Sequence, residues 1–197
     1  MKKGIIAIIA LGILGVIVVG WYVSTNNKLV DMKGQATKQW ANVESSYQRR
    51  SDLIGNLVKT VQGAADFERE TLTAVIEARA KATSTSIDAN NITPEQLAEF
   101  QQAQTGLSSA LSRLLVTVER YPDIKANQNF LELQSQLEGT ENRIKVARDK
   151  YNKAVSGYNV SVRKMPSAFV AGITGFSEKG MFEAEAGAEQ APKVNFD

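Results

Sequence analysis

Residues 4 to 27 carry no charged side chain, and this run constrains the chain more than any other feature. Its apolar part, residues 4–23, would span ~30 Å as a helix, which is about the thickness of a bilayer's hydrocarbon core. The run therefore predicts an N-terminal transmembrane anchor over residues 1–23. The alternative is a cleaved secretory signal, because Lys2 and Lys3 precede the run. The length of the run and the lack of an Ala-x-Ala pattern at its end favour an uncleaved anchor.

The end of the run carries Trp21 and Tyr22, followed by polar residues. Aromatic side chains concentrate at the membrane–water interface, so Trp21 and Tyr22 are candidate membrane-interface residues. The alternative for Trp21 is packing against a neighbouring helix. Counting of positive charges does not decide the orientation, because Lys2 and Lys3 on one side of the span face Lys28, Lys33 and Lys38 on the other. Lysines directly before a short N-terminal span usually favour a cytoplasmic N-terminus, which would place the following domain on the outer side.

Composition excludes several kinds of chemistry. The chain of 197 residues has no cysteine and no histidine, so thiol nucleophiles, imidazole catalysis and the commonest ligands of zinc, copper and haem are absent. The net charge of +2 gives no reason to expect a nucleic-acid binder. We therefore expect no catalytic residues, no cofactor, no metal and no enzyme activity.

The remaining sequence predicts an all-α fold. Apolar residues at three-four spacing, with no proline, predict one long helix over about residues 24–82, which can be continuous with the span. Thr93, Pro94 and Gln96 form a helix-start pattern, and the second helix is expected to end near Tyr121. A third helix is expected over about residues 123–164.

These three long helices predict an elongated antiparallel bundle over residues 24–165. A short segment, 166–183, is expected to pack on the bundle or on the membrane. Residues 184–197 are expected to form a flexible tail.

Polar residues interrupt the apolar faces of these helices. Length arithmetic brings Arg50 near the end of the second helix, which makes Arg50–Asp123 a plausible pair. An inter-helix iron site would require histidines, and sugar hydrolysis would require a cleft. We interpret these residues instead as a structural polar network that fixes helix register: Arg50, Glu68, Asp123, Glu141, Arg143 and Arg148.

An apolar seam extends along the membrane-proximal part of the first helix, through Trp40, Val43 and Tyr47. In a three-helix arrangement the second helix turns back before it reaches these residues. Either the C-terminal segment folds over them or helices of other subunits do. The second alternative makes them a candidate interface of a homo-oligomer with coiled-coil character.

Four stretches of the chain carry a specific sequence pattern: "NNKLVDMKGQATKQWANVESSYQRRSDLIGNLVKTVQG", "VIEARAKA", "ERYPDIKANQNFLELQSQLEGTENRIKVARDKYNKAVSGYN" and "MPSAFVAGITGFSEKGMFE". These stretches resemble the LemA family of bacterial membrane proteins. Small departures occur at Asn27, Gly55 and Met165, where the family usually has tyrosine, proline and phenylalanine.

The resemblance implies a single-pass protein of the bacterial inner membrane with an elongated helical bundle and no established enzyme activity. Some relatives are linked to magnetosome formation, which suggests a role in membrane organisation. Our first hypothesis is a self-associating membrane scaffold whose partners are the lipid bilayer, copies of itself and other membrane proteins. The alternative is an accessory binding module for a membrane enzyme or transporter, and a hydrolase is the least favoured reading.

Overall fold

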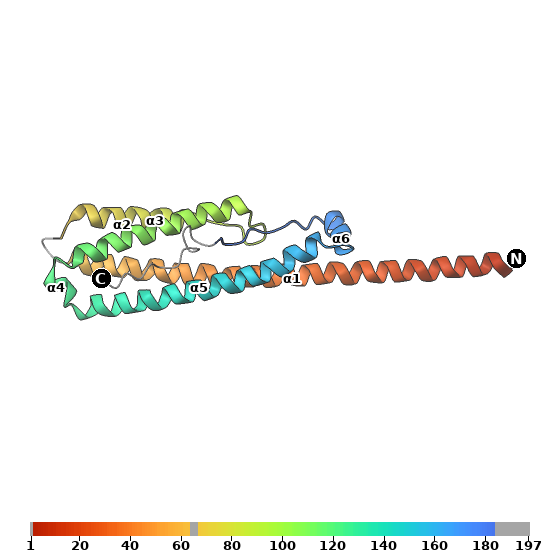
Figure 1. The fold of residues 1–197 in the computed structure, drawn as a ribbon, viewed down its shortest axis with the longest axis horizontal. Coiled ribbons are helices and arrows are strands. Elements are labelled where there is room, and N and C mark those ends of the chain that lie inside the picture. Colours follow the sequence, from red (N-terminus) through yellow and green to blue (C-terminus); the bar gives the residue numbers. More distant parts are fainter. Residues whose placement is uncertain (1, 64–66, 184–197) are drawn as a thin grey trace, which may run out of the picture.

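The computed structural model describes residues 2–63 and 67–183, and these form an elongated all-α protein (Figure 1). The described residues contain no strand, so the predicted fold class is confirmed. The helices are α1 (Lys2–Gln62), α2 (Arg69–Ser84), α3 (Pro94–Val118), α4 (Pro122–Lys125), α5 (Gln128–Arg163) and α6 (Ser167–Thr174).

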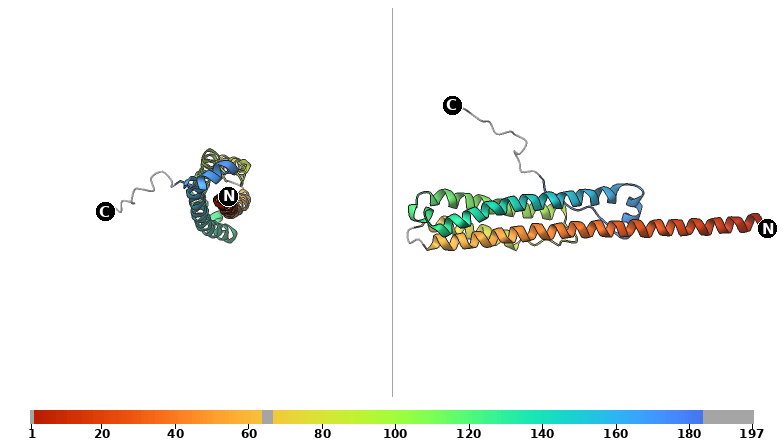
Figure 2. Two further views of the ribbon diagram at one scale, coloured as in Figure 1. Left: turned by 90° about the vertical axis from the view of Figure 1, so that its right-hand side faces the viewer. Right: turned by 90° about the horizontal axis from the view of Figure 1, so that it is seen from below.

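Helix α1 continues without a break from the apolar run into the bundle. It packs along the antiparallel α5, while α2 and α3 form a second antiparallel pair beside them (Figures 1 and 2). The bundle is thus built from α1, α2, α3 and α5, and only the C-terminal part of α1 takes part in it. The N-terminal part of α1 projects from the bundle alone.

The prediction of one helix over residues 24–82 is wrong, because the chain reverses after Gln62 and returns as α2. Two features favour the break. Gly63 is a weak helix former, and the Phe67 ring is buried against Tyr121 with their centroids 4.9 Å apart. No proline marks this turn, and the three-four spacing of apolar residues continues across it, so the two helices were predicted as one.

The start of α3 was predicted correctly. Thr93 Oγ1 accepts from the Gln96 backbone N–H at 3.2 Å, and Gln96 Oε1 accepts from the Thr93 N–H at 3.1 Å. The third predicted helix begins later than expected, because α4 forms a separate turn. The Asn127 side chain caps α5 by accepting from the backbone N–H groups of Asn129 and Phe130.

Two hydrophobic cores follow one another along the bundle. The aliphatic core, far from the N-terminus, contains Leu53, Ile54, Leu57, Val61, Leu107, Leu114 and their neighbours. The aromatic core, nearer the N-terminus, contains Trp40, Val43, Tyr47, Phe100, Tyr151 and Phe182. Buried polar residues of three helices lie between the two cores: Arg50 and Ser51 in α1, Gln104 in α3 and Thr140 in α5. We call these four residues the polar layer.

The segment after α6 turns back along the bundle as an extended strap, residues 177–183. It lies between α5 and the loop that joins α2 to α3, since the Gly180 N–H donates to Ile92 O at 2.9 Å. A Cβ at position 180 would stand 2.9 Å from Thr93 O, so this close approach requires glycine. Segment 166–183 therefore packs on the bundle, and the predicted tail, 184–197, lies outside the described residues.

Candidate functional site

Arg50 is the central charged group of the polar layer. Its side chain is only 3% exposed, and its Nε lies 3.0 Å from Oε1 of Glu141, which is half exposed. The Nε–H does not point along this contact, so the interaction is an ion pair rather than a well-directed hydrogen bond. Arg50 Nη2 also donates to Ser108 Oγ. Arg50 therefore connects α1 to both α3 and α5.

Gln104, Thr140 and the backbone of Ser51 are also held by hydrogen bonds, whereas the buried Ser51 hydroxyl has no partner among the described residues. Gln104 Nε2 donates to Ala82 O at 3.3 Å, and Thr140 Oγ1 donates to Gln136 O at 2.8 Å. The Ser51 carbonyl accepts from Arg79 Nε at 2.8 Å, which connects α1 to α2. Four helices are thus fixed at one level by polar contacts that a shift in helix register would break.

The predicted network is split in the structure. Arg50 pairs with Glu141 and not with Asp123, because the extra helix α2 displaces the later helices from the levels that a three-helix count assigns. Glu68 pairs with Arg120 at 2.8 Å at the far end of the bundle, where both side chains are exposed. Asp123 and Arg143 form no ion pair within residues 2–63 and 67–183.

Arg148 is part of a different site, the contact between α5 and the strap. Its guanidinium lies 4.7 Å from the centroid of the Phe182 ring, and it donates to Glu183 O at 3.1 Å. Arg148 therefore holds the end of the strap.

The prediction of Trp40, Val43 and Tyr47 as an oligomer interface is wrong, because all three are buried inside the chain's own aromatic core. Trp40 is covered by Phe100, by Tyr151 and by the stacked ring of Phe182 at 6.0 Å. The first alternative, a C-terminal segment folded over the seam, is the correct one.

Two Tyr-Asn pairs, seven residues apart on α5, bind the backbone of the strap. Asn152 Nδ2 donates to Phe182 O and Asn152 Oδ1 accepts from the Phe182 N–H, at 2.8 and 2.9 Å. Asn159 makes the same two bonds with Lys179. The neighbouring hydroxyls of Tyr151 and Tyr158 donate to Gly180 O and Ser177 O, both at 2.9 Å.

The strap brings Lys179 to a buried position, where its ammonium donates to Ala89 O and Asn90 O at 3.0 and 2.9 Å. Burial lowers the pKa of Lys179, the charge of Lys33 lowers it further, and Asp88 opposes this. This site was not predicted from the sequence. The signal was the repeat of "YN" at positions 151 and 158, which places both pairs on one face of a helix two turns apart.

Burial also raises the pKa of three tyrosines. For Tyr47 the raising effect of burial is opposed by the charges of Arg148 and Arg50. For Tyr151 and Tyr158 burial alone raises the pKa, and the rise is strongest for Tyr151. All three phenols are therefore kept neutral and serve as hydrophobic groups with a polar end.

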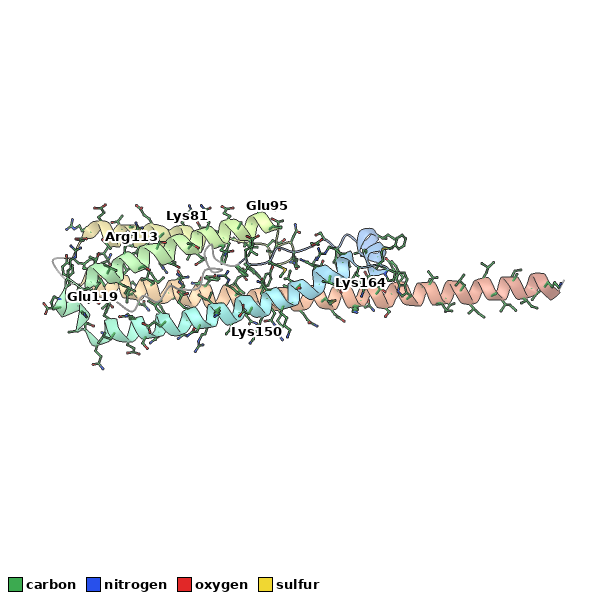
Figure 3. All side chains as sticks on the ribbon, in the orientation of Figure 1. Lys81, Glu95, Arg113, Glu119, Lys150 and Lys164 are labelled. Carbon is green, nitrogen blue, oxygen red and sulfur yellow. The ribbon has the colours of Figure 1, made fainter. Side chains whose placement is uncertain are left out.

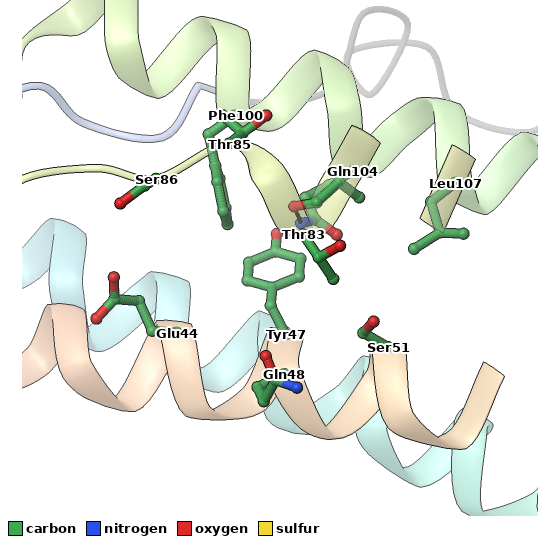
Figure 4. Close-up of a pocket in the computed structure, with 11 residues that line it drawn as sticks. Glu44, Tyr47, Gln48, Ser51, Thr83, Thr85, Ser86, Phe100, Gln104 and Leu107 are labelled. Carbon is green, nitrogen blue, oxygen red and sulfur yellow. Dashed lines mark hydrogen bonds between the residues drawn. The ribbon is translucent and has the colours of Figure 1, made fainter. Parts of the chain in front are cut away.

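Two surface hollows border the polar layer. A groove of about 380 Å³ between α3 and α5 is lined by Arg50, Ser108, Leu111, Leu137 and Glu141, among others. The second hollow, about 190 Å³, lies between α1, α3 and the end of α2, where Tyr47 points from α1 toward Gln104 and Thr83 (Figure 4). Among the described residues that line this second hollow, only Glu44 is charged. The hollow therefore offers hydroxyls and amides rather than acid–base pairs. The described residues contain no cluster of three or more acidic groups that could hold a metal.

The N-terminal part of α1 has the composition and length of a membrane span. Residues 4–21 are exposed, and α1 is long and apolar enough to cross a membrane. Trp21 is 36% exposed, whereas Tyr22 is half-buried against α6. These two predicted interface residues thus lie where the free part of α1 meets the bundle.

The fold and these sites define an all-α protein with an apolar N-terminal helix suited to a membrane and a bundle closed by its own C-terminal strap. The model of the LemA family matches residues 39–196, which is most of the chain. The protein belongs to the LemA family, as the resemblance indicated.

Named relatives agree with this assignment. The chain is 29% identical over 178 residues to magnetosome protein MamQ 2 of Paramagnetospirillum magneticum, covering 80% of this chain and 64% of the relative. It is 29% identical over 177 residues to magnetosome protein MamQ of Magnetospirillum gryphiswaldense, covering 79% and 64% of the two chains. Protein LemA of Metamycoplasma hominis is 23% identical over 141 residues, covering 72% and 61%. The chain thus spans a little under two thirds of the length of these curated relatives.

Proposed function

We propose that this protein is a single-pass, membrane-anchored helical scaffold of the bacterial inner membrane, and that it acts by binding rather than by catalysis. The observation that carries the proposal is the continuity of α1 from Lys2 to Gln62. The first part of this helix exposes apolar side chains on all sides. From Leu29 onward one face of the same helix is buried in the bundle. One helix therefore serves both as anchor and as central element of the domain.

The anchor can be tested by extraction of membranes from cells that express the full chain. We expect the protein to stay in the membrane in alkaline carbonate and to retain its N-terminal residues. Ile13→Lys places a charge in the middle of the span and should weaken anchoring. Val116→Lys, at a position 71% exposed on α3, is the matched control and should have no effect. A mature chain that begins near residue 24 would show instead that the run is a cleaved signal.

We further propose that the bundle lies on the outer side of the membrane, because Lys2 and Lys3 precede the span. The chain has no cysteine, so a Val116→Cys variant has a single reactive thiol. A membrane-impermeant maleimide should label this variant in intact cells. Labelling only after the cells are lysed would place the bundle in the cytoplasm.

We also propose that the protein self-associates in the membrane. A bilayer holds like-oriented anchors side by side, and this geometry favours planar or cyclic assemblies. The contacts must involve outer surfaces, since Trp40, Val43 and Tyr47 are in the core. The mass of the full chain in lipid nanodiscs or mild detergent tests this. A defined oligomer is expected, and a monomer at all concentrations would contradict it.

The second candidate is an accessory binding module for a membrane enzyme or transporter. The groove between α3 and α5 favours it, because Leu111 and Leu137 lie beside Arg50 and Glu141 in one concave surface. A photoreactive residue in place of Ser112, which lines this groove, should crosslink to a second membrane protein in cells. The same substitution at Thr73, an exposed position on α2, should not.

The names of the MamQ relatives connect them to magnetosomes, and for this chain they support a role in organising membranes. Deletion of the gene, followed by electron microscopy of the cell membranes, tests this role. Altered membrane shape or protein distribution is expected, and restoration should require the anchor.

A further inference from the structure

Helix α6 has two unlike faces. Val170 and Ala171 are buried against Leu29 of α1. On the other side, Phe169 and Ile173 are both 60% exposed, and Met165, just before the helix, is 70% exposed. Phe169 and Ile173 are one helical turn apart and therefore lie on one face of α6, and Met165 stands two residues before the helix. Three large apolar side chains are thus exposed in α6 and directly before it.

The position of α6 along α1 is defined by its contacts. The buried side of α6 forms a small hydrophobic cluster with Leu29 and with Tyr22, which is partly buried. Tyr22 is the last but one residue of the apolar run over residues 4–23, and Leu29 lies ~10 Å further along the helix. In Figure 1, α6 lies at the end of the bundle from which the free part of α1 projects. If α1 spans a bilayer, α6 is thus at the height of its headgroup region.

We infer that the exposed face of α6 is a second membrane contact: Met165, Phe169 and Ile173 enter the interfacial region of the bilayer that α1 crosses. This inference rests on the proposed anchor. The occupant is lipid, because the bilayer surrounds α1 at this height and the exposed Trp21 and Val23 lie in the same zone.

The charges around α6 fit an anionic lipid surface. Lys164 precedes α6 and lies where the bundle meets the free part of α1 (Figure 3). On α1, Lys28 is exposed and Lys33 lies 5.9 Å from the ring of Phe176. Arg163 is partly neutralised, since its Nε lies 3.6 Å from Glu178. Asp31, which is exposed on α1, offsets part of this charge. The remaining excess of positive charge favours anionic headgroups.

A contact between α6 and the bilayer would restrict the orientation of the bundle. A single helix that crosses a bilayer can rotate about its own axis and change its tilt. A second contact on one side of α1 fixes the direction in which the bundle leans. α6 is then a foot that determines which face of the bundle is turned toward the membrane.

The test uses the full chain in nanodiscs of phosphatidylcholine and phosphatidylglycerol. Three single-cysteine variants carry the same environment-sensitive fluorophore: Phe169→Cys on the foot, Val18→Cys in the span and Val116→Cys as an exposed control on α3. Some lipids carry a quencher near the headgroup end of the acyl chain. We expect labels at 18 and 169 to lose most of their emission and the label at 116 to keep it.

The other outcomes separate the two proposals. Quenching at 18 without quenching at 169 would overturn the foot and leave the anchor standing. Absence of lipid quenching at 18 would overturn the anchor itself. A label at 169 that is shielded both from lipid quencher and from aqueous iodide would mean that protein covers this face, either a second copy or a partner helix, and would also overturn the lipid contact.

Folding of the variants can be controlled. Phe169 is exposed, so its replacement should leave the melting temperature unchanged, and Ile173→Cys provides a second label on the same face. Replacing phosphatidylglycerol by phosphatidylcholine should reduce quenching at 169 but not at 18. Equal quenching at 169 in both lipid mixtures would remove the electrostatic part of the inference.

Discussion

The two cores of the bundle differ in how they are closed. The aliphatic core is formed by α1, α2, α3 and α5 and their connections, and aliphatic side chains predominate in it. The aromatic core lies beyond the reach of α2, and the strap takes the place of the missing helix by placing Phe182 on Trp40. The polar layer with Arg50 lies between the two. One end of the bundle is thus closed by helices and their connections, whereas the other end depends on an extended peptide segment.

The largest effect is expected for Trp40→Ala, which removes the largest side chain of the aromatic core. Loss of a buried Trp side chain costs about 3–5 kcal/mol in the free energy of unfolding. Because Phe182 stacks on Trp40, hydrogen exchange at the strap backbone should also increase. Leu57→Ala in the aliphatic core is the control and should lower stability while the strap stays protected. Equal loosening of the strap in both variants would contradict two separable cores.

The next effect concerns the polar layer and is asymmetric. Glu141→Gln leaves the buried Arg50 charge without a counter-ion and should cost about 1–3 kcal/mol in chemical denaturation. Arg50→Met leaves a half-exposed carboxylate in contact with water and should cost less. A double-mutant cycle measures the coupling of the pair. A larger cost for Arg50→Met would show that packing of the arginine side chain matters more than its charge.

A smaller effect is expected from the contacts between α5 and the strap. Asn159→Ala removes both hydrogen bonds to Lys179 and should cost about 1–2 kcal/mol. Exchange should rise at residues 177–183 before it rises in the aliphatic core. Asn142→Ala, at an exposed position on the same helix, should leave both quantities unchanged. Global unfolding without prior release of the strap would show that the strap is not a separate unit.

The smallest effect is a pH dependence confined to alkaline solution. Burial raises the pKa of Tyr47, Tyr151 and Tyr158 above the ordinary value of 10.0. Above that pH the unfolded chain has lost protons that the folded chain keeps, so stability falls as pH rises, by about 1.4 kcal/mol per pH unit for each proton. The pKa of Lys179 is lowered, so this group acts in the opposite direction up to its ordinary value of 10.5.

Tyr151→Phe tests this pH dependence, because burial raises the pKa of Tyr151 most. The decline of stability above pH 10 should become shallower in the variant, at the cost of the hydrogen bond to Gly180 O. Thermal melting between pH 8 and 11 measures both. An unchanged slope would mean that Tyr151 does not remain protonated in the folded protein.

Much of the fold could be predicted from local signals. The capping residues at Thr93 and Gln96 predicted the start of α3, and three-four spacing predicted the helical class. The reversal after Gln62 was hidden, since two helices joined without proline have the periodicity of one. Because this reversal was not predicted, the later helices were assigned wrong positions along the bundle axis, and Asp123 was predicted as the partner of Arg50 in place of Glu141.

The strap could not be predicted from periodicity, because its bonds depend on backbone atoms of an extended segment. Such a segment has no side-chain pattern of its own. The only sequence signal for the strap was on α5, in Asn152 and Asn159, whose side-chain amides can donate to and accept from the backbone of any segment. The seam through Trp40 was recognised correctly as one that needs a cover, but the sequence did not distinguish a cover from the same chain from one from another copy.

The continuity of α1 gives the molecule the mechanics of a lever. From Val23 to Gln62 the helix extends ~60 Å beyond the proposed span, and α5 stiffens most of that length. A change of ~10° in the tilt of the span would therefore move the far end of the bundle by ~10 Å, a displacement as large as the diameter of a helix. Differences in bilayer thickness of a few ångströms alter the tilt of a spanning helix. Such differences in bilayer thickness would therefore move the end of the bundle that is far from the membrane sideways.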